Sequence, residues 1–183
     1  MAILYLVINN YIAHSAPYPS IYMAWEKNIP FIPEFIIFYQ SMLLILFVIF
    51  MLPRARSELY TFVYRLLFIY VISYIFFLTF PLEFAFEKPE LHEGAFIDFL
   101  FLLLNENDLP YNQCPSLHIS SFVVYWFAVR AYLTNIYLKT SVALWFLLVM
   151  SSVLFVYQHH FLDIPAGVAV GLVAVWLFKD RVK

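Results

Sequence analysis

Five long apolar runs, each bounded by charged residues or prolines, limit what this sequence can fold into. They cover residues 34–52, 59–80, 117–133, 140–157 and 164–178. A helix of about 20 mostly apolar residues is needed to cross the hydrocarbon core of a bilayer. Runs of this length and composition are typical of such helices. The pattern therefore predicts membrane-spanning helices.

The composition agrees with this prediction and excludes several other classes. The 183 residues are 64% hydrophobic and only 12% charged, whereas soluble domains are about 45–50% apolar and about 25% charged. So apolar a chain is not intrinsically disordered, and 3 glycines and 1 cysteine exclude a collagen-like repeat and a disulfide scaffold. The low basic content predicts no nucleic-acid partner. We expect an all-α polytopic membrane protein with a single membrane-embedded domain over residues 1–183.

Two further apolar segments are shorter than a span. Residues 1–13 fit either a clipped or tilted first span or an interfacial helix, and they lack the positive start and cleavage site of a signal peptide. With this segment the bundle has about six transmembrane helices. Residues 95–104 are apolar enough to lie on the membrane surface as a short helix.

Basic residues gather at one set of span ends. Eight of the ten lie there, while Lys27 and Lys88 lie at the opposite ends; the eight are Arg54, Arg56, Arg65, Arg130, Lys139, Lys179, Arg181 and Lys183. Arg65 lies one or two turns inside its span, from where it can snorkel outward. Lysine and arginine in short loops mark the cytoplasmic side. The two long connections, residues 14–33 and 81–116, are therefore expected to face outward.

Three polar groups are predicted to share this outward side. They are residues 114–118 (CPSLH), residues 159–163 (HHFLD) and the pair Lys88-Pro89. Pro115 suits the first turn of a helix, and the free N–H groups that follow it, together with the Ser116 hydroxyl, form a cradle for an anion. His118 lies about one turn inside, within reach of a group that leaves this anion.

The second group has the spacing of an oriented imidazole. If the segment is helical, His159 and Asp163 lie on one face, so the carboxylate can hold one ring nitrogen and leave the other free as nucleophile or base. With His118 as the acid and Lys88 to offset phosphate charge, the parts describe phosphoryl transfer.

These motifs resemble the type 2 phosphatidic acid phosphatase superfamily. CPSLH followed about 40 residues later by HHFLD, with both motifs on one side of a six-span bundle, is similar to its lipid phosphate phosphatases and undecaprenyl diphosphate phosphatases. PSLH in place of PSGH resembles the branch that includes inositolphosphorylceramide synthase-like phosphotransferases. The resemblance implies His159 as a nucleophile that forms a phosphohistidine, Asp163 as its orienter, His118 as acid and then base, and Ser116 as a phosphate ligand. It implies no metal and no other cofactor, and a bacterial inner membrane with the site on its periplasmic or extracellular side.

Two cationic positions of the family pattern are changed. Pro81 occupies the lysine position of the first motif, of which only Lys88-Pro89 remains, and Val153 stands where the third motif has an arginine. The charge of the transition state would then rest on Lys88 and the helix terminus. Possible supporting groups are Asn112, Gln113, Tyr157, Gln158 and His160.

Alternatives remain for several of these residues. The histidines could instead bind zinc with Asp163, the ligands being His118, His159, His160 and His92. Ser116 and Asp163 could simply cap their helices, and Lys88 could belong to a solvated ion-pair cluster with its neighbouring glutamates. The GxxxG pattern of Gly167 and Gly171 fits either close packing within the chain or a homodimer contact.

Three functions follow from these alternatives. The first is a lipid phosphatase that hydrolyses a phosphomonoester or diphosphate of a membrane lipid. The second is a phosphotransferase that passes the phosphorylated group to a lipid hydroxyl. The third is a lipid-binding or transport protein with a degenerate site.

Overall fold

The computed structural model describes residues 2–52, 55–90 and 94–179, and the regular elements of this part of the chain are helices joined by loops. It contains seven α-helices, two short 3-10 helices and no strand: α1 (Ala2–Ala13), η1 (Ala24–Asn28), η2 (Pro33–Phe35), α2 (Ile36–Met51), α3 (Arg56–Thr79), α4 (Ala95–Asn107), α5 (Leu117–Val129), α6 (Ile136–Phe155) and α7 (Asp163–Leu177). The all-α class predicted from the sequence is confirmed.

Three helical segments of the described residues are long and apolar enough to cross a membrane. They are Pro33–Met51, Arg56–Thr79 and Ile136–Phe155, and only 17%, 33% and 22% of their apolar windows are buried inside the protein. Their outer faces are apolar yet uncovered, which suits lipid as the surrounding solvent. Helices α1, α5 and α7 are apolar but shorter, so the count of six spans stays a prediction.

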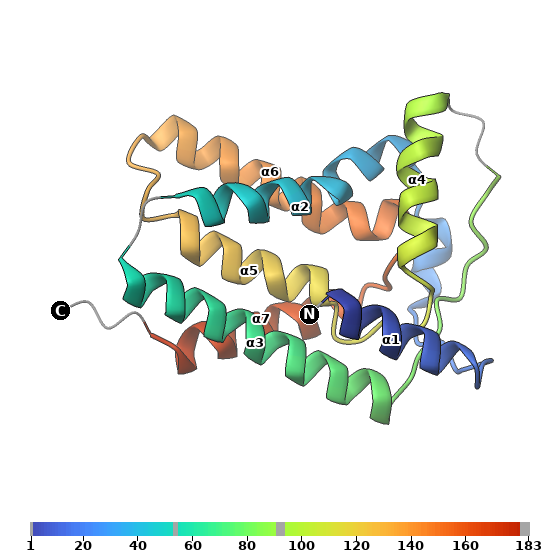
Figure 1. The fold of residues 1–183 in the computed structure, drawn as a ribbon. Helices are drawn as coiled ribbons and strands as arrows, with labels where there is room; N and C mark the ends of the chain where they lie inside the picture. Colours follow the sequence, from blue (N-terminus) through green and yellow to red (C-terminus); the bar gives the residue numbers. More distant parts are fainter. Residues whose placement is uncertain (1, 53–54, 91–93, 180–183) are drawn as a thin grey trace.

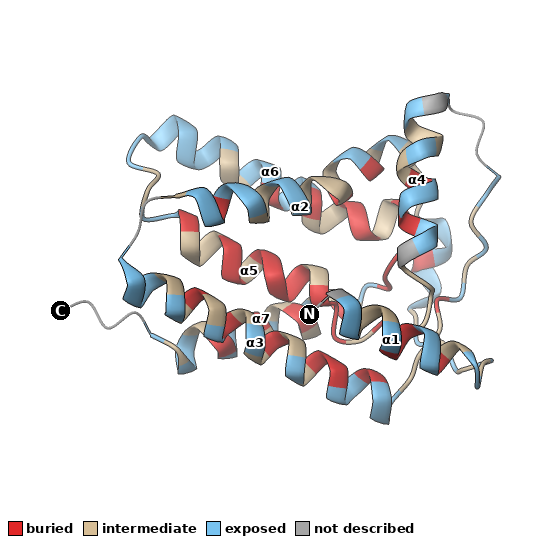
Figure 2. Ribbon diagram, in the orientation of Figure 1, coloured by how far each residue is buried: buried red, intermediate tan, exposed pale blue. Residues whose placement is uncertain are grey.

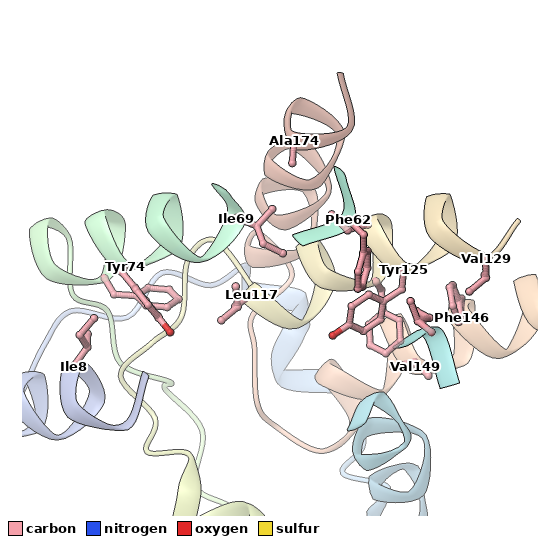
Figure 3. Close-up of a cluster of buried hydrophobic side chains, with 14 of the residues drawn as sticks. Ile8, Phe62, Ile69, Tyr74, Leu117, Tyr125, Val129, Phe146, Val149 and Ala174 are labelled. Carbon is pink, nitrogen blue, oxygen red and sulfur yellow. The ribbon is translucent and has the colours of Figure 1, made fainter. Parts of the chain in front are cut away.

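Helix α5 lies in the middle of the bundle. Helices α2 and α6 lie on one side of it and α3 and α7 on the other (Figure 1). Figure 2 shows that α5 is the helix with the most continuous buried surface. Its Tyr125 is 1% exposed and packs against Phe62 of α3, with ring centroids 6.1 Å apart. Figure 3 shows this contact within the main apolar cluster, to which Phe146 of α6 also belongs.

Helix α4 runs across the ends of the other helices rather than alongside them (Figure 1). The predicted surface helix at residues 95–104 is thus a helix, and it continues to Asn107. Its direction is the one expected of a helix that lies in the plane of a membrane surface.

Two predicted span limits are corrected by local hydrogen bonds. Helix α6 begins four residues before the predicted start at 140, because the Asn135 side chain caps it by accepting from the N–H of Tyr137 (2.8 Å) and of Leu138 (3.3 Å). Helix α5 ends at Val129 and not at 133, because a turn follows in which the Tyr132 N–H donates to the Val129 carbonyl (2.9 Å).

The described basic residues of the predicted cytoplasmic set share one end of the bundle. Arg56, Arg130, Lys139 and Lys179 lie at helix ends on the side of the C-terminus, opposite the first turns of α5 and α7 (Figure 1). Arg54, Arg181 and Lys183 lie outside the described residues. Arg65 does not snorkel outward as expected. It is 4% exposed, and its Nε donates to the carbonyl of Phe178 at the end of α7 (2.9 Å).

Candidate active site

The first turns of α5 and α7 lie in direct contact at one end of the bundle. The Ser116 N–H donates to the Asp163 carbonyl (3.2 Å), which joins the two motifs through their backbones. A Cβ on Gly167 would lie 2.6 Å from the Ser116 carbonyl oxygen, and a Cβ on Gly171 would lie 2.7 Å from Cβ of Val123. Both glycines therefore allow α7 to approach α5 within the chain, and α5 occupies the face that a homodimer contact through them would use.

This contact brings the two histidines of the motifs together. The rings of His118, in the first turn of α5, and His159, in the loop before α7, have centroids 5.9 Å apart. His159 is 5% exposed, while His118 is partly buried. The convergence predicted from the sequence is present in the structure.

Asp163 holds His159 by a turn and not by a helical face. The helix begins only at Asp163, and the chain before it turns at Tyr157, whose φ is 53°. Across this turn Asp163 Oδ2 lies 3.3 Å from His159 Nδ1, and the same oxygen accepts from the His160 N–H (2.9 Å). The spacing of four residues thus predicted the contact between His159 and Asp163, but this contact crosses a turn and not a helical face. His159 Nε2 is the ring nitrogen that does not face the carboxylate.

Helix α5 starts one residue after Ser116. Ser116 is the N-cap, and its Oγ accepts from the Ile119 N–H (3.4 Å), so Pro115 precedes the cap instead of occupying the first turn. The Ser116 side chain is completely buried. Its role as a phosphate ligand stays a prediction, because the capping bond accounts for the hydroxyl in this conformation.

Cys114 directly precedes this cap. Burial, reinforced by the negative charge of Asp163 and a hydrogen bond to it, raises the pKa of the Cys114 thiol to about 12. A thiol with so high a pKa is a poor nucleophile near neutral pH.

Lys88 is half-buried in the loop between α3 and α4. Burial lowers the pKa of Lys88, and the negative charge of Asp108, at the end of α4, opposes this effect. Asp108 is thus a carboxylate whose charge acts on Lys88, and the ion-pair cluster with the neighbouring glutamates stays an alternative. Burial in turn raises the pKa of Asp108, while two tyrosine hydrogen bonds and the charges of His159 and Lys88 act in the opposite direction. Lys88 therefore belongs to the same electrostatic environment as the histidine pair.

His160 is held between two other loops. Its Nδ1 lies 2.9 Å from Glu26 Oε2, and its Nε2 accepts from the Ala85 N–H (3.1 Å). A ring nitrogen that accepts carries no proton, so Nδ1 is the donor to Glu26. The ring also stacks on Phe84, with centroids 4.3 Å apart. Both nitrogens are thus used in joining loops, and a supporting contact from His160 to phosphate stays a prediction.

The remaining supporting candidates lie close to the motifs. Tyr157 donates its hydroxyl to the Ile29 carbonyl (2.8 Å), and Gln158 is buried beside His159. Asn112 and Gln113 are both buried, and Asn112 forms a β-bridge with Leu82. Their contacts with a phosphate stay predictions as well.

The zinc alternative is not supported by the arrangement of the described residues. Among them no three or more side chains of histidine, cysteine, aspartate or glutamate are grouped as they would be around a metal ion. His92 lies outside the described residues.

A cavity of about 420 Å³ opens beside His118 between α1, α2, α3, α4 and α5. Its wall is mostly apolar, and its polar groups include Asp108, Tyr39 and His118; the other lining residues are Tyr5, Leu6, Gln40, Met42, Leu43, Tyr70, Leu103, Leu104 and Leu117. Sequence reasoning missed Tyr39, Asp108 and Glu26. Of these three, Asp108 is the one that the sequence could have indicated, because it is the last acidic residue before CPSLH.

Comparison with known proteins decides the family. The family model described as the PAP2 superfamily matches residues 79–182, more than half of the chain, and this segment contains both motifs. The chain belongs to the PAP2 superfamily. Members of this superfamily are phosphatases or phosphotransferases, so the PAP2 assignment and the apolar helices together indicate an integral membrane enzyme. The comparisons with curated proteins and with solved structures gave no match.

Proposed function

We propose that this PAP2 protein is a lipid phosphatase that hydrolyses a phosphomonoester or diphosphate of a membrane lipid through a phosphohistidine. The observation that carries the proposal is the pairing of His118 and His159, 5.9 Å apart, with Asp163 behind His159. Two imidazoles at this separation can act on opposite sides of one phosphorus atom.

The proposed first step forms a bond between His159 Nε2 and phosphorus while the bond from phosphorus to the lipid oxygen breaks. His118 gives a proton to the leaving oxygen, and Asp163 stabilises the positive charge that develops on His159. In the second step His118 takes a proton from water, whose oxygen attacks phosphorus as the bond to His159 breaks. Inorganic phosphate and the free enzyme are the products.

Lys88 is proposed to offset the charge of the phosphate, with help from the N–H groups at the first turn of α5. The lipid nature of the substrate is supported by the cavity beside His118, which is large enough for part of an apolar chain and has a largely apolar wall. The lipid chain would lie in this cavity and the phosphate at its polar end. We propose a bacterial inner membrane, with the site on its periplasmic side, as the location.

A phosphotransferase is the second candidate, favoured by the position of Leu117. This residue of PSLH lines the cavity directly beside His118, where the acceptor must approach. If a lipid hydroxyl takes the place of water in the second step, the phosphoryl group passes to that lipid.

The test uses protein purified in detergent with EDTA present. Phosphatidic acid and a polyprenyl diphosphate are supplied separately, each with and without a lipid alcohol. We expect release of inorganic phosphate, and a loss of about 10²-fold or more in His118→Ala and in His159→Ala. His14→Ala is the matched control, because His14 is exposed in the turn after α1.

Four results would contradict the proposal. Turnover that is unchanged in both site variants would place the chemistry elsewhere, and turnover that disappears with EDTA would indicate a metal enzyme. Lipid binding without turnover of any substrate would favour the lipid-binding or transport alternative. Transfer of the phosphoryl group to the added alcohol, rather than to water, would favour the phosphotransferase.

A further inference from the structure

A chain of hydrogen-bonding groups runs from half-buried Asp108 to His118 through Tyr39 of α2. The Tyr39 hydroxyl lies 3.3 Å from Asp108 Oδ2 and 3.3 Å from His118 Nδ1. The rings of Tyr39 and His118 are also in contact, with centroids 4.5 Å apart. Tyr39 is 3% exposed. His118 is thus flanked by His159 and, at its Nδ1, by a tyrosine that the family motifs do not contain.

Asp108 is surrounded by donors that fix its role in this chain. The Tyr5 hydroxyl and the Asn9 amide, both from α1, donate to Oδ1. The Asn9 amide also donates to the Leu109 carbonyl (3.1 Å). With these donors on Oδ1, the carboxylate can accept from Tyr39 at Oδ2. Three helices that are distant in sequence thereby meet behind one histidine.

The donors and acceptors along these hydrogen bonds determine which ring nitrogen of His118 carries the proton. A tyrosine hydroxyl has one proton, and because an ionised carboxylate can only accept, the contact with Asp108 requires that Tyr39 donate it there. Toward His118 the Tyr39 oxygen can only accept, so the neutral imidazole must carry its proton on Nδ1. The other nitrogen, Nε2, then has the free lone pair that a base needs, and it holds the transferable proton when the ring is charged.

We propose that Tyr39, held by Asp108, is a positioning residue that fixes the orientation and tautomer of His118. The proposal rests on the proposed function, because it assigns His118 Nε2 as the atom that exchanges a proton with substrate and water. Tyr5 and Tyr39 lie before residue 79, outside the segment that matches the PAP2 family. This part of the site is therefore supplied by the N-terminal helices.

Several titratable groups surround His118, so an experiment must distinguish the effect of Tyr39 from theirs. The titratable groups on the elements that surround it are Tyr39 on α2, Tyr5 on α1, Tyr70 on α3, Asp108 after α4 and His159 before α7, together with Lys88, whose charge acts on Asp108. Because several of them titrate, a pH profile alone would not isolate Tyr39. The tautomer of His118 is the more direct measurement, since it responds to the groups that contact the ring nitrogens, and the Tyr39 hydroxyl lies 3.3 Å from Nδ1.

The experiment records ¹⁵N NMR spectra of histidine-labelled protein in detergent micelles, above the pH at which His118 becomes neutral. The His118 signals are assigned by their loss in His118→Ala. We expect the proton on Nδ1 in the unsubstituted protein. Tyr39→Phe removes the acceptor and should shift the population toward Nε2–H, the tautomer that neutral imidazole favours in water. Asp108→Asn should act in the same direction, because the amide can donate to Tyr39 and turn its hydroxyl toward His118.

Kinetics supply the second measurement. Tyr39→Phe should lower kcat by about tenfold to a hundredfold, a part of what a positioned acid contributes, with KM changed less than threefold. Tyr125→Phe is the matched control, because it makes the same change at a residue that is 1% exposed on the helix of His118. The His118 tautomer and the kcat of Tyr125→Phe should equal those of the unsubstituted protein.

Two results would overturn the proposal. One is a proton on His118 Nε2 in the unsubstituted protein, and the other is a Tyr39→Phe variant whose tautomer and kcat equal those of Tyr125→Phe. The tautomer is measured without any substrate. If the protein hydrolyses no lipid phosphate while His118 still carries its proton on Nδ1, the proposed function fails and the positioning by Tyr39 stands.

Discussion

The N–H of Ser116 donates to the carbonyl of Asp163 across 3.2 Å, and this bond fixes the N-cap of α5 against the first residue of α7. His118 lies two residues after one partner, and His159 four residues before the other. The separation of the two imidazoles is therefore set by how closely these helix ends approach. That approach depends on Gly167, which faces the Ser116 carbonyl.

We expect Gly167→Ala to destabilise the protein and to reduce its activity. The added Cβ would lie 2.6 Å from a backbone oxygen, which cannot rotate away as a side chain can. Overpacking of this kind costs about 1–3 kcal/mol, and it should lower the unfolding temperature measured in detergent. Val173→Ala on the same helix is the control, because Val173 is 45% exposed. Equal unfolding temperatures for the two variants would mean that α5 and α7 are less closely packed than described.

Leu43→Trp should weaken the use of long-chain substrates. Leu43 lines the cavity beside His118, and an indole there would take the space of the lipid chain. We expect KM for a long-chain lipid phosphate to rise about tenfold, equivalent to about 1.4 kcal/mol, with little change for a short-chain, water-soluble phosphate ester. Leu44→Trp is a close control, because Leu43 and Leu44 are both 64% exposed and only Leu43 lines the cavity. A similar KM in both variants would argue against the cavity as the chain-binding site.

Lys88 should give the enzyme an alkaline limit. Burial lowers the pKa of Lys88, so as pH rises the ammonium loses its charge earlier than an exposed lysine would. Phosphate affinity then falls above that lowered pKa. Lys88→Arg should move the decline of kcat/KM to higher pH, because the guanidinium stays charged. Lys88→Gln should lower kcat/KM by about tenfold to a hundredfold below the pKa of Lys88, as for a lost charge-assisted bond of about 1.5–3 kcal/mol, and the difference should shrink above that pKa. An alkaline limit that is identical in the arginine variant would assign it to another group.

Glu26→Gln should destabilise the loops around the site. The carboxylate accepts from His160 Nδ1 (2.9 Å) and the Phe161 N–H (3.0 Å) through Oε2, and from the Met23 N–H (2.6 Å) through Oε1. A glutamine keeps the shape but presents an amide N–H to at least one of these donors. We expect a loss of about 1.5–3 kcal/mol in the free energy of unfolding. Glu34→Gln is the control and should have little effect, since Glu34 is exposed. Equal free energies of unfolding for the two variants would mean that the Glu26 hydrogen bonds do not stabilise these loops.

The parts of this fold that the sequence predicts well are those determined by composition over many residues. The apolar runs at residues 34–52 and 59–80 lie within two residues of the ends of Pro33–Met51 and within three of those of Arg56–Thr79. Local hydrogen bonds determine other helix ends. The Asn135 side chain, for example, caps α6 about one turn before the predicted start. The pairing of His118 with His159 was also predictable, because both follow from the side on which their spans begin.

The residues that the sequence does not reveal are those whose role depends on tertiary contacts. Tyr39 is one of 14 tyrosines, and nothing near it in the chain suggests a histidine partner 79 positions away. Glu26 lies in a segment that reads as a connecting loop, yet it is 1% exposed. Such groups become visible only when α1, α2 and the loops are placed around the motifs.

The position of Tyr39 on α2 has a consequence for how such proteins diverge. Both reacting nitrogens belong to the second half of the chain, whereas Tyr39 and Tyr5, which lie behind one of them with Asp108, come from the first forty residues. A shortened chain that began at residue 79 would retain both histidine motifs but lose the tyrosines that are proposed to place the proton on His118. Exchanging the N-terminal helices between related chains would then retune proton transfer without altering a single motif letter.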